Sequence, residues 1–140
     1  MRTPASIAGH PIHPMLVPLA IGLWIFSFVC DLTFVLGSGA SLWYTLSFWT
    51  MIGGIAGAVI AAIPGTIDML SLTGRPKKLA LTHMAINLTV VLLYAVNLGM
   101  RIEGNPVSGI PLALTLVSVS LLAVSGWIGG QMVYVHRVGV

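Results

Sequence analysis

Residues 14–36 read PMLVPLAIGLWIFSFVCDLTFVL, an apolar run whose only charged residue is Asp31. A transmembrane helix needs about 20 predominantly apolar residues to cross a hydrocarbon core of about 30 Å. The run meets that length and is too long for the apolar region of a cleaved signal peptide. The sequence therefore predicts a retained membrane-spanning helix here.

The whole chain has the same apolar character. It has 140 residues, of which 57% are hydrophobic and 6% are charged, whereas soluble domains are about 25% charged. This composition predicts an integral membrane protein whose first partner is the lipid bilayer. The single Cys30 excludes a disulfide framework within the chain. The chain has a net charge of +3, but its longest basic run is Lys77-Lys78. We therefore expect no nucleic-acid partner.

Three further apolar segments follow, at about residues 42–63, 79–100 and 110–135. Each is long enough to span a bilayer. Pro64-Gly65 is predicted to end the second segment, which leaves residues 66–78 as a loop. The predicted fold is all-α, an integral membrane four-helix bundle that forms a single domain over residues 1–140.

Four spans place both termini on the same side of the membrane. Only Arg101 lies on the opposite side, and the other basic residues lie with the termini: Arg2, Arg75, Lys77, Lys78 and Arg137. Because Lys and Arg concentrate in cytoplasmic loops, we expect both termini to be cytoplasmic.

The four histidines all fall at this predicted cytoplasmic face. His10 and His13 precede the first span, His83 lies near the start of the third, and His136 closes the fourth. Asp68 and Gln131 belong to the same layer. Imidazole is a common ligand of haem iron, zinc, copper and nickel. The layer is therefore a candidate cofactor site, and His83, within the span, is its strongest candidate ligand.

The opening motif Gly9-His10-Pro11-Ile12-His13-Pro14 places each of its histidines before a proline. A residue before proline favours an extended or polyproline conformation. In that geometry His10 and His13 project in the same direction, about 9 Å apart. We expect one of them to bind a metal opposite His83. The other would orient the bound group, shuttle protons or bind a propionate of haem.

His136 has a plainer alternative, because a histidine beside Arg137 at a helix end is often only solvated. The neighbouring Gly129 would leave room for a flat ligand beside it.

A polar stripe runs along one face of the third span. Polar groups within a span usually face the bundle interior and mark a pathway or a site. Asp31 lies at a depth in the membrane similar to that of Asn97 and is predicted to pair with Arg101. The pair could be functional or purely structural. The stripe consists of His83, Asn87, Val90, Tyr94, Asn97 and Arg101.

Several motifs together resemble a bacterial membrane protein family. They are GHPIHP (9–14), IGLW (21–24), AIPGTID (62–68), His83 with NL (87–88), LYAVNL (93–98) and SGWIGGQMVY (125–134). With these residues the chain resembles the family called domain of unknown function 2231. Members often have glutamate where this sequence has Gln131.

The resemblance implies a place in the bacterial inner membrane. Some members resemble fusions to Rieske-type iron–sulfur domains, which implies redox partners. A Rieske-type or ferredoxin-like protein, or a larger membrane complex, is therefore an expected partner, and a homo-oligomer is a further option.

Haem b is the expected cofactor, in a small membrane electron-transfer protein. His83 would be one axial ligand, with His13, His10 or His136 opposite. An alternative is a transition-metal ion used for transport or sensing, with Asp68 as an additional ligand.

A further alternative is a non-catalytic accessory subunit without a cofactor. Proton conduction along the polar stripe is the weakest of the alternatives. No catalytic nucleophile with its base, phosphate loop or paired carboxylates is apparent in the sequence, so we do not expect an enzyme.

Overall fold

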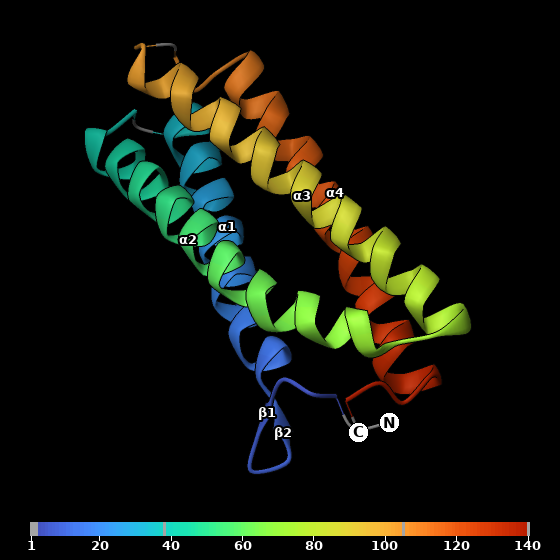
Figure 1. Ribbon diagram of the computed structural model, residues 1–140. Coiled ribbons are helices and arrows are strands. Elements are labelled where there is room, and N and C mark those ends of the chain that lie inside the picture. Colours follow the sequence, from blue (N-terminus) through green and yellow to red (C-terminus); the bar gives the residue numbers. More distant parts are fainter. Residues whose placement is uncertain (1–2, 38, 105, 140) are drawn as a thin grey trace.

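The computed structural model describes residues 3–37, 39–104 and 106–139. In this part of the chain four long helices follow a short β-hairpin (Figure 1). All four are long and apolar enough to cross a membrane, which confirms the predicted all-α membrane bundle. The helices are α1 (Ile12–Leu36), α2 (Ser41–Ser71), α3 (Gly74–Ile102) and α4 (Ile110–Gly130), and the π-helical turn η1 (Gln131–Val135) continues α4.

The four helices are arranged as two helical hairpins. α1 packs mainly along α2, and α3 packs mainly along α4, with fewer contacts between the two hairpins. Figure 1 shows the hairpins side by side, blue to green and yellow to red. A buried cluster of large side chains fills the centre of the bundle: Trp24, Met51, Val90, Tyr94 and Leu122.

Helix α2 is longer than the sequence predicts. It continues through Pro64 to Ser71, and Figure 1 shows it changing direction in its second half. Proline removes one helical hydrogen bond and bends a helix, but a transmembrane helix tolerates it when neighbouring groups satisfy the freed backbone. The predicted loop over residues 66–78 is therefore wrong, because α3 already begins at Gly74.

The opening motif is not in polyproline conformation. Strands β1 (Ser6–Ile7) and β2 (His10–Pro11) form an antiparallel hairpin. Both turn residues, Ala8 and Gly9, have positive φ, as the type I′ turn of a two-residue hairpin requires. Helix α1 then begins at Ile12 and includes His13, so the predicted polyproline conformation from His10 to His13 is wrong.

The bundle has two distinct ends. We call one the histidine end, which holds the β-hairpin, the α2–α3 turn and η1. The other is the loop end, which holds the α1–α2 and α3–α4 connections. Four helices in two hairpins place both described chain ends at the histidine end, where Gly139 lies against Pro11.

Candidate functional site

Two of the four histidines face each other at the histidine end. His13 lies in the first turn of α1, and His83 lies near the start of α3. Their ring centroids are 6.2 Å apart and their planes are nearly perpendicular, at 87°. The two rings therefore join the two helical hairpins, which contribute one imidazole each.

Each of these rings is held by a backbone carbonyl of the partner helix in its own hairpin. His13 Nδ1 lies 2.8 Å from the carbonyl oxygen of Ala61, and His83 Nδ1 lies 3.0 Å from that of Ser125. A carbonyl oxygen only accepts hydrogen bonds, so Nδ1 carries the hydrogen in both rings. In the neutral rings Nε2 then keeps its lone pair, and a histidine in this state can act as a metal ligand.

Further contacts fix the position of both rings. Asn87 donates one hydrogen bond to the His83 carbonyl and one to Ser125 Oγ, both at 2.8 Å. A Cβ at Gly65 would lie 2.7 Å from His13 Nδ1, so only glycine fits beside that ring. Gly129 lies against His83, where a Cβ would be 3.5 Å from Cε1. Gly129 therefore contacts the His83 ring.

The other two histidines are in different surroundings from this pair. His10 is exposed in the β-hairpin, and its Nδ1 lies 3.1 Å from the Ala8 carbonyl. His136 follows η1 and is half-buried. In the described part of the chain, no hydrogen bond or ring contact joins either of them to the pair of His13 and His83.

Asp68 holds the N-terminal segment on α2. Its Oδ1 accepts a 2.8 Å hydrogen bond from the Ala5 amide. Over residues 3–37, 39–104 and 106–139, no group of three or more His, Cys, Asp or Glu side chains is placed to hold a metal ion. Gln131 begins η1 and is half-buried.

The loop end contains the ion pair that the sequence predicts. Arg101 binds Asp31 through both guanidinium ends, with Nη1–Oδ1 at 2.9 Å and Nη2–Oδ2 at 2.6 Å. Both side chains have 0% exposure. Such a bidentate pair is among the stronger charge-assisted contacts in proteins.

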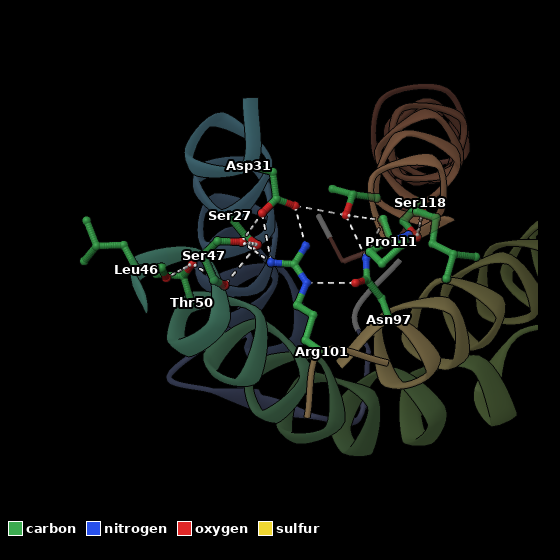
Figure 2. Close-up of polar contacts among 11 residues, drawn as sticks. Ser27, Asp31, Leu46, Ser47, Thr50, Asn97, Arg101, Pro111 and Ser118 are labelled. Carbon is green, nitrogen blue, oxygen red and sulfur yellow. Dashed lines mark hydrogen bonds and ion pairs between the residues drawn. The ribbon is translucent and has the colours of Figure 1, made fainter. Parts of the chain in front are cut away.

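Neighbouring polar groups complete this ion pair, as Figure 2 shows. Arg101 Nε donates to Asn97 Oδ1 at 2.9 Å. Asn97 in turn donates to the Pro111 carbonyl and to Thr115 Oγ1, both at 2.8 Å. Ser47 Oγ donates to Asp31 Oδ1 at 2.5 Å. Each of these side chains therefore has a hydrogen-bond partner within the protein.

The centre of the bundle is aromatic. Trp24 and Tyr94 stack with a centroid distance of 4.6 Å and an interplanar angle of 5°. Within the described residues, the buried Trp24 Nε1 and Tyr94 hydroxyl have no hydrogen-bond partner. The polar stripe does face the interior, but its hydrogen bonds are interrupted at Tyr94, between Asn87 and Asn97.

The sequence-based prediction missed the hydroxyl groups that complete both polar sites. Ser125 accepts from Asn87 beside His83, and Ser47 and Thr115 flank Asp31. These residues interrupt otherwise apolar segments, which is the sequence feature that could have identified them. Their partners depend on helix packing and could not be assigned from spacing alone.

Comparisons with known proteins identify a family. No curated protein and no solved structure gives a significant match. A family model described as "Predicted membrane protein (DUF2231)" matches residues 9–140, which include the opening histidine motif and all four helices. The chain therefore belongs to the predicted membrane proteins of domain-of-unknown-function family 2231.

Proposed function

We propose that this protein is a small membrane electron-transfer protein that binds b-type haem between His13 and His83. The observation that carries the proposal is the facing pair of imidazoles, each held through Nδ1 by a backbone carbonyl. In the described part of the chain, His13 and His83 are the only histidines whose rings contact each other, so we do not assign His10 or His136 as haem ligands.

The separation of the two rings supports a shared metal. A metal–imidazole bond is about 2.0–2.1 Å long. Two imidazole rings that both bound one metal ion through Nε2 would have centroids up to roughly 6 Å apart. The observed distance of 6.2 Å between His13 and His83 is close to this value.

The number of protein ligands favours haem over a free ion. A zinc site uses three or four protein ligands, whereas no His, Cys, Asp or Glu in the described residues joins the pair to make a group of three. Haem would need fewer ligands from the protein than a free ion does. His13 and His83 would hold it, and two imidazole ligands would suit it to electron transfer rather than to oxygen chemistry.

We propose that the histidine end faces the cytoplasm of a bacterium, with the protein in the inner membrane. The basic residues of this end are Arg75, Lys77, Lys78 and Arg137, and Arg2 lies outside the described residues. Arg101, at the loop end, is buried against Asp31. Positive charge thus concentrates at the histidine end, as expected for the cytoplasmic side. A Rieske-type or ferredoxin-like partner would exchange electrons at this face.

The test is an absorbance spectrum of the protein purified in detergent after expression with added haem precursor. We expect a Soret band and the sharp reduced bands of six-coordinate haem. His13→Ala and His83→Ala should each abolish the six-coordinate spectrum. His10→Ala and His136→Ala are the matched controls and should leave the spectrum unchanged.

A colourless preparation that cannot be reconstituted with haem would overturn the proposal. Metal analysis of the same samples tests the alternative of a transition-metal ion, which predicts bound metal that is lost in His83→Ala. The accessory-subunit alternative predicts a cofactor-free protein that co-purifies with a larger membrane complex.

A further inference from the structure

Three contacts between the helical hairpins obey one numerical rule. Asp31 and Arg101, which form the buried ion pair, are 70 positions apart. The facing rings of His13 and His83 have the same separation. So do the stacked rings of Trp24 and Tyr94. At three levels of the bundle, a residue of α1 therefore contacts its counterpart in α3 under one constant shift.

The same rule relates the buried faces of the helices. When 70 is added to each residue number of α1, buried positions of α1 align with buried positions of α3. Ala20, Trp24, Ser27 and Asp31 align with Val90, Tyr94, Asn97 and Arg101, respectively. A second constant shift, which carries residue 47 to residue 111, relates α2 to α4. It superimposes the buried residues Ser47, Met51, Gly54 and Ala61 on Pro111, Thr115, Ser118 and Ser125.

The hydrogen bonds inside each hairpin follow the same two shifts. The bond from His13 to the Ala61 carbonyl recurs as the bond from His83 to the Ser125 carbonyl. At the other end, Ser27 donates to the Ser47 carbonyl. Its counterpart Asn97 donates to the Pro111 carbonyl. Even Gly65, beside His13, recurs as Gly129 beside His83.

We infer that the protein is a fusion of two copies of one two-helix unit, related by a pseudo-two-fold axis along the bundle. In a two-fold interface a residue on the axis contacts its own counterpart, as the three pairs do. Each unit has two spans, so both have the same orientation and the axis is normal to the membrane. The site of the proposed function lies on this axis, and each unit supplies one equivalent imidazole.

The charged pair on the axis distinguishes the two units. Two identical units would bring two aspartates or two arginines together in the core, which is strongly unfavourable. Asp31 and Arg101 instead make the two units complementary. The groups around them are the hydroxyls of Ser47 and Thr115 and the amide of Asn97, and each of these can donate or accept. The surroundings therefore suit either placement of the two charges.

Exchange of the two charges in the full-length chain tests the inference. Asp31→Arg and Arg101→Asp alone should each lower the thermal midpoint in detergent by roughly 10 °C or more, since each leaves like charges buried together. The double exchange should recover most of this loss. The control is the exchange Asn87→Ser with Ser125→Asn, a contacting pair that the axis does not relate, and here we expect no recovery.

A second exchange decides the question if the charge variants do not fold. Trp24→Tyr combined with Tyr94→Trp should keep the midpoint within a few degrees of the wild type, because the two positions are equivalent. A double exchange that is no more stable than its less stable single variant would overturn the inference. Both exchanges are measured by stability, so a failure to bind haem would overturn the proposed function and leave this result intact.

Discussion

The two ends of the bundle each hold a polar pair on the same axis, but the pairs differ in how completely they are satisfied. At the loop end, the side chains of Asp31 and Arg101 are fully buried, and all three guanidinium nitrogens of Arg101 donate hydrogen bonds. At the histidine end, His13 and His83 are half-buried, and each ring uses only Nδ1 in the hydrogen bonds described. The loop-end pair is thus satisfied within the protein, whereas each ring at the histidine end keeps Nε2 outside the described hydrogen bonds, where the proposed ligand would bind.

The difference follows from the chemistry of the groups. A charge in the membrane interior must be neutralised by a partner within reach, because an unpaired charge there is costly. A neutral imidazole can keep a free lone pair at much lower cost, provided that its other nitrogen is bound. The comparison predicts that substitutions at the loop end mainly change stability, whereas those at the histidine end mainly change ligand binding.

The largest effect is expected for Arg101→Met. This change leaves the Asp31 carboxylate buried without its countercharge, which should reduce the free energy of unfolding by about 3–5 kcal/mol. Denaturant unfolding in detergent, followed by circular dichroism, measures the loss. Arg75→Met removes an exposed arginine at the histidine end and should leave stability nearly unchanged. Equal stability of the two variants would show that the buried pair is dispensable.

A smaller effect is expected for Gly65→Ala. The new methyl group would lie 2.7 Å from His13 Nδ1, so the ring must move away from the Ala61 carbonyl. Overpacking of this kind costs about 1–3 kcal/mol, and displacement of the ring should weaken haem binding in a titration. Gly129→Ala is the matched control, because its Cβ would make an ordinary 3.5 Å contact with His83. Identical behaviour of the two variants would contradict the geometry described for His13.

The smallest effect on stability is expected for Asn87→Ala. It removes hydrogen bonds to the His83 carbonyl and to Ser125 Oγ, which should cost about 1 kcal/mol. Because Asn87 helps to orient the candidate ligand, haem affinity should fall by about 10-fold or more. Asn97→Ala, in the loop-end network, should instead lose more stability and leave haem affinity unchanged. The reverse pattern would refute the division between the two ends.

The features that depend on burial in lipid could be predicted from the amino-acid sequence. Four apolar runs of sufficient length predict four spans, because a helix satisfies its own backbone in hydrocarbon. The helical spacing of Val90, Tyr94, Asn97 and Arg101 predicts the interior face of α3, which the structure confirms. The pairing of Asp31 with Arg101 could be predicted because Arg101 is the only basic residue on that side of the predicted topology.

The contact between the two histidine rings and the relation between the two hairpins depend on how the helices pack, and they could not be predicted from the sequence. The positive-φ turn at Ala8-Gly9 places His10 in a hairpin and starts α1 early enough to hold His13, whereas local proline rules predicted otherwise. The repeat is hidden in the sequence because equivalent positions hold different residues, such as Trp24 and Tyr94. Packing across a two-fold axis constrains the combined size, polarity and charge of the two paired side chains. These constraints can be recognised only when the contacts between the helices are known.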